Sequence, residues 1–279
     1  MSAGGAKRGG VQVGTRFVRA ALAGLSAAAL AGSVGCGGDA GGGSAPTTGA
    51  SGTGVTGTVT VFAAASLTES FTRIGKDFEG ANPGSTVKFN FAGSSALATQ
   101  INQGAPADVF AAASPAPMKT VTDAGNGGGT PTTFVKNQLV IAAPKGNPKG
   151  VTGLSDLAKP GVKVALCAPE VPCGAAAQKV LDTADVSIKP VTLEQDVKAA
   201  LSKVKLGEVD AALVYRTDVK ASSSDVDGVE FPESASALND YPVIVVKNAP
   251  NSAGAQAFVA YVLSGKGTAV LTAAGFQAP

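Results

Sequence analysis

Residues 58–78, TVTVFAAASLTESFTRIGKDF, decide the fold. The first seven of them, TVTVFAA, are mostly apolar or β-branched, a composition typical of a buried strand. In the remainder, apolar side chains recur at i, i+4, i+7 and i+11, a spacing that places on one helical face Leu67, Phe71, Ile74 and Phe78. A strand that runs directly into an amphipathic helix predicts a parallel βαβ unit, and therefore an α/β fold.

The same alternation continues along the chain. Short β-branched runs predict further strands at 86–92, 108–110, 137–146, 162–167, 210–215 and 241–248. Amphipathic segments predict helices at 97–101, 175–181, 197–206, 255–263 and 268–274. Because strands and helices alternate without a visible internal repeat, we expect an α/β protein of one or two compact domains.

The first 35 residues have the pattern of a signal peptide. They carry four basic residues and no acidic one, and the basic residues precede a run of small apolar residues at 20–31. That run is too short to span a bilayer as a helix. It is followed by SVGC at 33–36, which resembles a bacterial lipobox although serine stands where leucine is usual. We therefore predict a signal peptide at 1–35 and a lipid on Cys36; the alternative is cleavage nearby without a lipid.

Residues 36–57 predict a lipid anchor followed by a flexible linker. After the cysteine, nearly all of them are Gly, Ser, Thr, Ala or Pro, which bury too little apolar surface to fold. A flexible chain of this length has an end-to-end distance of about 25 Å. The linker therefore lets a folded body stand clear of a membrane and still dock onto a partner in it.

Composition and charge exclude several functions. The 279 residues contain no histidine, which removes serine–histidine catalysis and the commonest metal ligand at neutral pH. The formal net charge is +2, and loss of the four basic residues of the signal peptide leaves the mature chain at about −2. With no basic patch and no interleaved aromatic run in what remains, we do not expect nucleic acid as a partner.

The cysteines predict one disulfide. The chain has three, and if Cys36 carries lipid, Cys167 and Cys173 remain as an even pair in an oxidising compartment. They lie in LCAPEVPCG at 166–174, where two prolines favour turns. A bridge there would stabilise the loop by about 2 kcal/mol. The alternatives are a redox pair, whose usual spacing is absent, and a metal site, which would lack histidine ligands.

Four junctions between a strand and a helix are candidate ligand sites. In open α/β sheets, ligands bind beyond the carboxyl ends of the strands, where helix N-termini present free N–H groups. The junctions are FAAASLTES with Ser66, FAGSSALA with Ser94, VPCGAAA with Cys173, and TLEQDVKAAL with Val197. The strand DAALVY ends on Tyr215, whose neutral phenol is a further hydrogen-bond donor.

The hydroxyl residues also have ordinary structural interpretations. Ser66 with Glu69 fits the S-x-x-E pattern of a capping box. Ser94 and Ser95 fit a pair of N-cap residues at the start of the next helix. Tyr215 is equally compatible with an amphipathic residue at the edge of a sheet. Local sequence leaves these interpretations open.

The junction before the helix at 197–206 raises a question of charge. Thr192 with Gln195 could cap that helix, in which case Val197 would be an ordinary core residue. Glu194 and Asp196 flank the same junction. If an anion binds there, both carboxylates must point away from it.

Together these segments resemble the molybdate-binding proteins of bacterial ABC importers. The resemblance extends from about residue 58 to 276, nearly the whole mature chain. It is carried, in the family's order, by VFAAASLT, FAGSSALATQI, GAPADVF, LVIAAPKG, PEVPCG, EQDVKAAL, VYRTD and DYPVIVV. FAAASLT together with GAPAD is fairly specific, whereas LVIAAPKG is shared more widely.

The resemblance implies the two-lobed fold of periplasmic binding proteins, in which each lobe is a mixed sheet flanked by helices. Lobe 1 would comprise residues 58–137 and 246–279, and lobe 2 residues 138–245. Two crossover strands would join the lobes, near 137–141 and 241–245. A ligand would lie in the cleft between the lobes.

The resemblance also implies five contacts to an oxyanion. Matched residue by residue, they fall on Ser66, Ser94, Cys173, Val197 and Tyr215. The two serines would give hydroxyl and amide donors, Cys173 and Val197 backbone amides, and Tyr215 its hydroxyl. Cys173 stands where the family commonly has alanine, a change that keeps the amide donor.

The function implied is that of an extracytoplasmic, lipid-anchored solute-binding protein, and not that of an enzyme. It would capture molybdate or tungstate, without a cofactor and with metal present only as the oxyanion, and deliver it as a monomer to the permease of an ABC transporter. Another tetrahedral oxyanion, such as sulfate, is the alternative ligand. A phosphate-ester hydrolase and a ligand-free structural lipoprotein are the competing classes, and the composition argues against the first.

Overall fold

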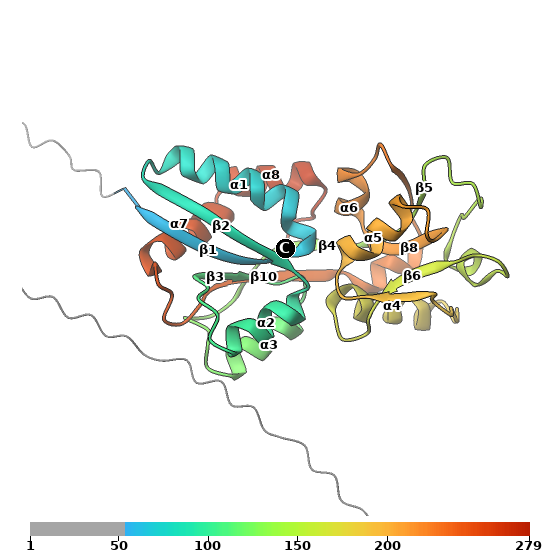
Figure 1. The fold of residues 1–279 in the computed structure, drawn as a ribbon, viewed down its shortest axis with the longest axis horizontal. Helices are drawn as coiled ribbons and strands as arrows, with labels where there is room; N and C mark the ends of the chain where they lie inside the picture. The colour runs from blue at the N-terminus through green and yellow to red at the C-terminus, as the bar shows by residue number, and fades with distance from the viewer. Residues whose placement is uncertain (1–53) are drawn as a thin grey trace, which may run out of the picture. The chain divides into compact units, whose positions relative to one another are not determined.

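The computed structural model describes residues 54–279, which form two lobes, each built on a five-stranded sheet (Figure 1). The predicted signal peptide, Cys36 and all but the last four residues of the predicted linker lie outside the described residues. The predicted α/β class, with two mixed sheets flanked by helices, is confirmed.

The first sheet has the strand order β2-β1-β3-β10-β4. Its strands are β1 (Gly57–Ala64), β2 (Ser85–Ala92), β3 (Val109–Ala111), β10 (Asn239–Val245) and β4 (Thr132–Asn137). β1 pairs in parallel with β2 and β3, whereas β10 is antiparallel to both β3 and β4. The long connection from β4 back to β10 passes through the second lobe, so the first lobe is discontinuous in sequence.

Helices cover both faces of this sheet because side chains alternate along β1. Val59 and Val61 pack with Phe71 and Phe78 in one core, and Phe62 packs with Leu97 in another. The first core is covered by α1 (Thr68–Ala81), α7 (Ser252–Leu263) and α8 (Gly265–Ala274), and the second by α2 (Ser94–Asn102) and α3 (Pro115–Asp123). A short 3-10 turn, η1 (Ala65–Leu67), connects β1 to α1.

The second sheet has the order β7-β6-β8-β5-β9. Its strands are β5 (Leu139–Pro144), β6 (Val164–Cys167), β7 (Thr192–Glu194), β8 (Ala211–Tyr215) and β9 (Val226–Val229). It is flanked by α4 (Pro172–Thr183), α5 (Val197–Lys205) and α6 (Arg216–Ala221), with 3-10 segments η2 (Leu154–Ala158) and η3 (Pro232–Ala237). β8 is central and entirely buried, so its last residue is held firmly at the edge facing the first lobe.

The chain crosses between the lobes at Gln138 and returns at Leu238. The sequence-based boundary at 245 is therefore wrong, because β10 pairs with β3 and β4 and belongs to the first sheet. The first lobe comprises 57–137 and 239–279, and the second 138–238. The strand DYPVIVV alternates in a way that suits either sheet, and only its hydrogen-bond partners decide between them.

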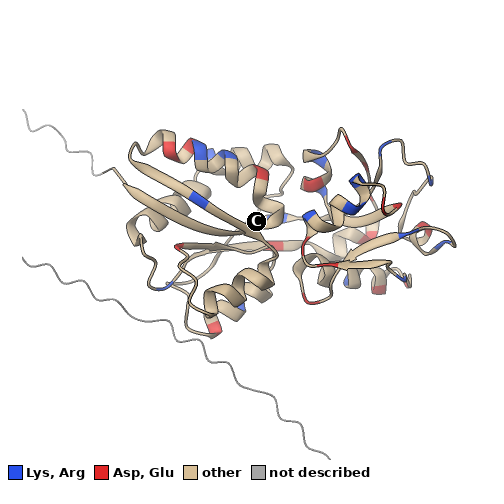
Figure 2. Cartoon of the chain, viewed as in Figure 1, with Lys and Arg blue, Asp and Glu red and all other residues tan. Residues whose placement is uncertain are grey.

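The distribution of charged residues and the apolarity of the helices do not indicate a particular function. Basic and acidic residues are interspersed over both lobes (Figure 2). Within residues 54–279, no single helix has the length and apolarity needed to cross a bilayer, although α7 and α8 taken together meet those criteria with a bend of 60° between them.

Candidate ligand-binding site

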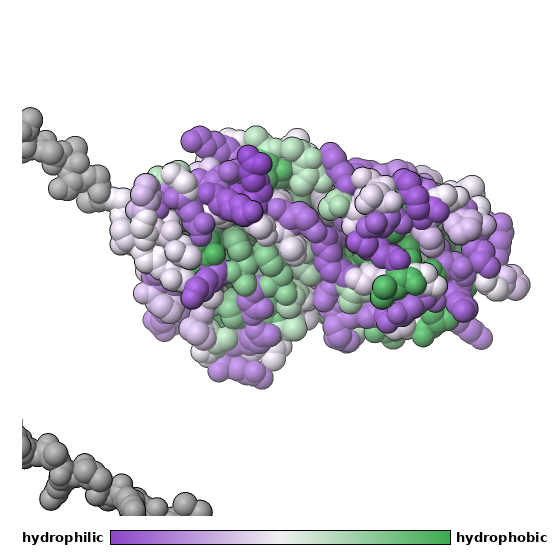
Figure 3. Space-filling view, turned by 45° about the horizontal axis from the view of Figure 1, so that its top comes forward, coloured by the Kyte–Doolittle hydropathy of each residue, from purple (hydrophilic) through white to green (hydrophobic). Residues whose placement is uncertain are grey.

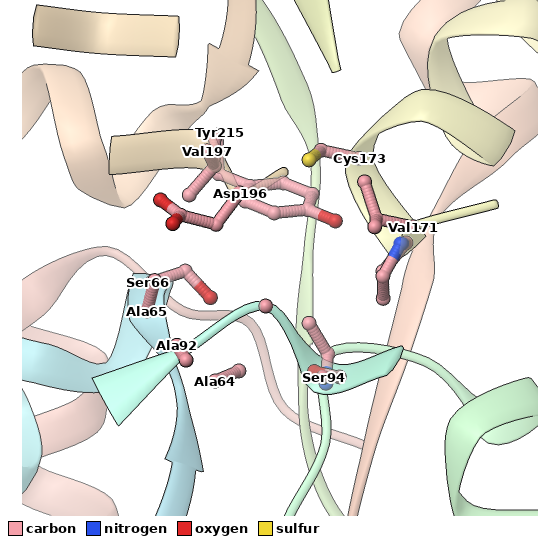
Figure 4. A pocket seen from close by; sticks show the side chains of 13 residues that line it. Ala64, Ala65, Ser66, Ala92, Ser94, Val171, Cys173, Asp196, Val197 and Tyr215 are labelled. Carbon is pink, nitrogen blue, oxygen red and sulfur yellow. The ribbon is translucent and has the colours of Figure 1, made fainter. Parts of the chain in front are cut away.

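One cavity between the lobes brings together all five residues expected to contact a ligand (Figure 4). Its lining residues are Ala64, Ala65, Ser66, Ala92, Gly93, Ser94, Ala113, Val171, Pro172, Cys173, Asp196, Val197 and Tyr215. The cavity is small, with a volume of about 20 Å³. That volume suits one small polyatomic ion and not a sugar or a peptide.

Four helical N-termini converge on this cavity, two from each lobe. They are the starts of η1, α2, α4 and α5, all of which follow the carboxyl end of a strand or a short turn after it. The first N–H groups of a helix have no acceptor within the helix and carry a partial positive charge. Pro172 has no N–H, so Cys173 supplies the first amide of α4. The geometry favours an anion.

Ser66 is buried, and its hydroxyl lies 2.8 Å from the hydroxyl of Tyr241 on β10. The capping-box interpretation of Ser66 and Glu69 is wrong. The residue before α1 is Leu67, and the Glu69 carboxylate instead accepts a hydrogen bond from Lys198 of the second lobe at 2.7 Å. The Ser66 hydroxyl therefore remains available to the cavity.

Ser94 is also buried, and its hydroxyl oxygen accepts a hydrogen bond from the Ala113 amide at 3.0 Å. The predicted pair of N-cap serines is wrong, because Gly93 occupies the N-cap position of α2. Ser95 instead donates to the carbonyl of Glu170 at 2.8 Å, a bond from the first lobe to the second.

The lobes approach each other most closely at Gly93. A β-carbon added there would clash with the carbonyl oxygen of Gln195, which belongs to the second lobe. No real side chain tolerates so close an approach. With the Ser95–Glu170 bond beside it, this contact means that the structure is closed around the cavity. The space-filling view likewise shows the two lobes in contact (Figure 3).

Tyr215 reaches the cavity from the end of β8 and is 1% exposed. The edge-residue interpretation is wrong, since β8 lies between β5 and β6. Burial raises the pKa of Tyr215 well above its usual value, with the neighbouring Tyr241 and Asp218 acting in the same direction. The phenol is therefore neutral and retains its hydrogen at physiological pH.

Val197 lines the cavity and is the first residue of α5, so its amide is the first N–H of that helix. The predicted cap by Thr192 and Gln195 is wrong, because Asp196 caps the helix by accepting from the Ala199 amide at 2.9 Å. Figure 4 shows the Asp196 carboxylate directed away from the Tyr215 hydroxyl. Among the described residues that line the cavity, Asp196 is the only charged one.

The predicted disulfide between Cys167 and Cys173 is confirmed, with Cα atoms 5.7 Å apart. It joins the end of β6 to the first turn of α4. The loop between them folds back so tightly that a β-carbon on Gly174 would lie within contact distance of the Ala168 backbone. The bridge and the glycine together hold the Cys173 amide at the cavity.

Three residues behind the cavity were missed by sequence reasoning. They are Asn137, Asn239 and Tyr241, and all three are buried. Tyr241 is hydrogen-bonded to Ser66 and to Asn137, and Asn239 is hydrogen-bonded to Tyr215. Asn137 and Asn239 are paired across β4 and β10, where the chain passes between the lobes. Each ends or begins a strand, and polar residues at strand ends are too common to signal a site.

The described part of the chain matches the family model described as "Bacterial extracellular solute-binding protein" over residues 59–277. The "Molybdate-binding protein ModA" of Mycobacterium tuberculosis is 45% identical over 222 residues, 80% of this chain and 85% of the relative. The "Putative ABC transporter substrate-binding lipoprotein YvgL" of Bacillus subtilis is 33% identical over 79% of this chain and 86% of its own.

A solved structure agrees with these relatives. The substrate-binding domain of a putative molybdenum ABC transporter from Clostridium difficile superimposes with a TM-score of 0.59 at 28% identity, covering 80% of this chain and 99% of that one. The family model spans more than half of the chain, and the mycobacterial relative is 45% identical over 80% of it. The chain belongs to the family of bacterial extracellular solute-binding proteins.

Proposed function

We propose that this protein captures molybdate, and tungstate with it, and presents the ion to the permease of an ABC transporter. The observation that carries the proposal is the closed cavity between the lobes, whose described lining includes three hydroxyl residues and the first residues of four helices, and no basic side chain. Its five proposed ligand contacts are Ser66, Ser94, Cys173, Val197 and Tyr215. The relatives named for molybdate binding support the choice of ion.

Donors of this kind suit a doubly negative ion that carries no hydrogen. Each hydrogen bond from a neutral donor to a charged oxygen contributes roughly 1.5–3 kcal/mol when water is excluded. A tetrahedral dianion has enough lone pairs to accept from every hydroxyl and helix N-terminus around the cavity. Hydrogen phosphate has a hydrogen of its own, for which the backbone amides provide no acceptor and a hydroxyl provides one only in place of donating, so it binds less well.

The protein binds and releases its ligand unchanged. The side chains that line the cavity include a single carboxylate, Asp196, which is engaged in capping α5, and no acid–base pair. Chemistry on a bound oxyanion would need a second placed proton donor or acceptor. We therefore assign a transport role and no enzymatic one.

The lipid anchor and the monomeric state belong to the same proposal. Cys36 in the lipobox-like SVGC supports lipidation, as does the name of the Bacillus subtilis relative. The linker at 37–57 then tethers the two-lobed body at the outer face of the membrane, within reach of the permease. Expression of the full chain with and without Cys36→Ala tests this, because the parent is expected in the membrane fraction and the variant in the medium.

Calorimetric titration of the secreted chain without lipid tests the ligand. The protein is titrated with molybdate, tungstate, sulfate and hydrogen phosphate at one ionic strength. Molybdate and tungstate are expected to bind with similar affinity, sulfate more weakly because it is smaller, and hydrogen phosphate weakest. Tighter binding of sulfate than of molybdate would overturn the assignment of the ion, and no binding of any oxyanion would overturn the site itself.

A further inference from the structure

Each of the three hydroxyls that line the proposed site also makes a hydrogen bond to a protein group outside the cavity. A hydroxyl has one hydrogen and two lone pairs, so the direction of its existing bond decides whether its hydrogen is free for a ligand. The simplest case is Ser94, whose oxygen accepts from the Ala113 amide at 3.0 Å. An amide N–H cannot accept in return, so the Ser94 hydrogen is left for the cavity.

The Tyr215 hydroxyl oxygen also accepts a hydrogen bond, in this case from the side chain of Asn239. The Nδ2 of Asn239 donates to the Ala113 carbonyl at 2.8 Å and to the Tyr215 hydroxyl at 3.1 Å. The bond to a carbonyl fixes which end of the amide is nitrogen, because only the NH₂ end can donate. The Tyr215 oxygen therefore accepts from Asn239, and its own hydrogen can point either at a ligand or at the neighbouring Tyr241 hydroxyl.

A longer chain of hydrogen bonds, from Asn137 through Tyr241, reaches Ser66. The side-chain oxygen of Asn137 accepts from the Gln138 amide at 2.9 Å, which fixes the orientation of its NH₂ group. That group donates to Thr217 at 2.9 Å and lies 3.4 Å from the Tyr241 hydroxyl. Since Tyr241 accepts from Asn137, its hydrogen is available to Ser66, 2.8 Å away. Either hydroxyl of this pair can be the donor, and the direction proposed here, from Tyr241 to Ser66, leaves the Ser66 hydrogen for the cavity.

We propose that Asn137, Tyr241 and Asn239 are specificity-determining positioning residues that orient the hydroxyls of Ser66 and Tyr215 as donors. The inference rests on the proposed oxyanion site. With Ser94 oriented by Ala113, the bonds donated to the three hydroxyl oxygens leave their three hydrogens to a bound anion. An anion that carries a hydrogen finds three donors and loses one of its bonds, whereas a hydrogen-free dianion satisfies all three.

The position of the asparagines couples this orientation to closure. Asn137 and Asn239 face each other across β4 and β10, at the two points where the chain crosses between lobes. Asn239 belongs to the first lobe and Tyr215 to the second, so their bond joins the two lobes, and we expect it to break when the lobes separate. The donor set is therefore completed on closure.

The first test is a double-mutant cycle between Asn239 and Tyr215, with molybdate and hydrogen phosphate as the two probes. Asn239→Leu removes the incoming bond, and the Tyr215 hydroxyl is then free to turn towards Tyr241, its neighbour in the buried network. We expect molybdate affinity to fall about tenfold. In the Tyr215→Phe background, the same substitution is expected to change affinity by less than about twofold, because the two residues act through one hydroxyl.

The selectivity ratio separates positioning from simple packing. Asn239→Leu is expected to reduce the preference for molybdate over hydrogen phosphate, since a reoriented Tyr215 hydroxyl can accept from a protonated ligand. A purely structural role would weaken both anions equally and would be additive with Tyr215→Phe. Equal weakening or additivity overturns the inference for this branch.

The second test uses Tyr241→Phe, which removes the Tyr241 hydroxyl and little volume. Its effect on molybdate affinity is expected to be several-fold in the parent and absent in the Ser66→Ala background. Tyr261→Phe, on the surface-facing helix α7, is the matched control and is expected to leave affinity unchanged. An effect of Tyr241→Phe that persists undiminished without the Ser66 hydroxyl overturns this branch.

The parent protein distinguishes failure of this inference from failure of the proposed function. If the parent binds none of the oxyanions, the site itself is wrong and the inference falls with it. If the parent binds molybdate and both cycles are additive, the site stands and only the orienting role of Asn239 and Tyr241 is overturned.

Discussion

The ammonium group of Lys198 on α5 lies 2.7 Å from the carboxylate of Glu69 on α1, so an ion pair joins the two lobes beside the cavity. The same ammonium lies 3.1 Å from Asp218, whose side chain is fully buried in the second lobe. Lys198 therefore has one partner in its own lobe and one that it meets only on closure. The pair with Glu69 favours the closed state without contacting the ligand.

Glu69→Gln is expected to weaken molybdate binding about two- to fivefold, the range for a partly exposed ion pair. Lys198 keeps Asp218 as a partner, so the stability of the ligand-free protein should hardly change. Titration calorimetry and thermal unfolding give the two quantities. Asp77→Asn is the matched control, because it removes an ion pair with Arg73 that lies within α1 alone. Equal loss of affinity in both variants would contradict a role in closure.

Gly93→Ala is expected to prevent full closure, because the new methyl group would clash with the Gln195 carbonyl oxygen. Overpacking of this kind costs about 1–3 kcal/mol, so affinity should fall roughly tenfold or more. The ligand-free fold should survive, since the clash arises only between lobes. Gly80→Ala, on an exposed position of α1 with nothing within 4 Å of the new carbon, is the control and should bind normally. Tight binding by Gly93→Ala would show that closure is not required.

Ser94→Ala and Tyr215→Phe each remove one proposed donor to the anion. Each should weaken molybdate binding about tenfold or more, the usual cost of one hydrogen bond to a charged group. The circular dichroism spectrum should match that of the parent. Normal affinity in both variants would mean that the ligand does not occupy this cavity.

Asp218 predicts a pH dependence of stability. Burial raises the pKa of its carboxyl from 3.8 to about 6, although Lys198 opposes the shift. A folded-state pKa above the unfolded value means that the folded protein binds the proton more tightly, so stability is highest below about pH 4 and is lost as the pH rises to about 6. The full difference is on the order of 3 kcal/mol.

Chemical denaturation between pH 4 and 6.5 measures this effect. Asp218→Asn cannot titrate, so its free energy of unfolding should rise relative to that of the parent across this interval. Asp156 acts in a separate range, because its hydrogen bonds with Lys159 and Thr152 hold its pKa well below the usual value and its contribution is lost only at lower pH. Parallel curves for parent and Asp218→Asn would contradict the raised pKa.

The disulfide is expected to stabilise the fold and not to bind the ligand directly. The double variant Cys167→Ala with Cys173→Ala should lose about 2 kcal/mol of stability, since the bridge closes a short loop. Its affinity for molybdate should persist because an alanine at 173 keeps the backbone amide. Complete loss of binding by a protein that remains folded would assign the sulfur atoms a larger role.

Part of this structure was determined by local sequence. The spacing of Leu67, Phe71, Ile74 and Phe78 predicted a helix, and all four are 0–1% exposed in the core beneath α1. Such a pattern depends on residues three or four positions apart, so it can be recognised without knowing any distant partner. The cysteine pair was likewise predicted, because few pairings are possible with so few cysteines.

Short or polar elements were not predicted. The strand β4 reads TTFVKN, and α6 is only six residues long, so neither shows a clear period. These elements exist because neighbours complete their hydrogen bonds: β4 by pairing with β10, and α6 by its start at the end of β8. Tertiary context overrides local preference at such segments.

Local sequence patterns predicted the α/β class, the principal helices and the disulfide pair, and the family resemblance predicted five candidate contacts. Tertiary structure alone decided that β10 belongs to the first sheet, that the five residues surround one cavity, and that Asn137, Asn239 and Tyr241 stand behind them. The physical reason is the range of the interactions. Periodicity is a local property of the chain, and the possible cysteine pairs are few. Strand pairing and hydroxyl orientation depend on groups far apart in the sequence, such as Ser66 and Tyr241, which are 175 positions apart.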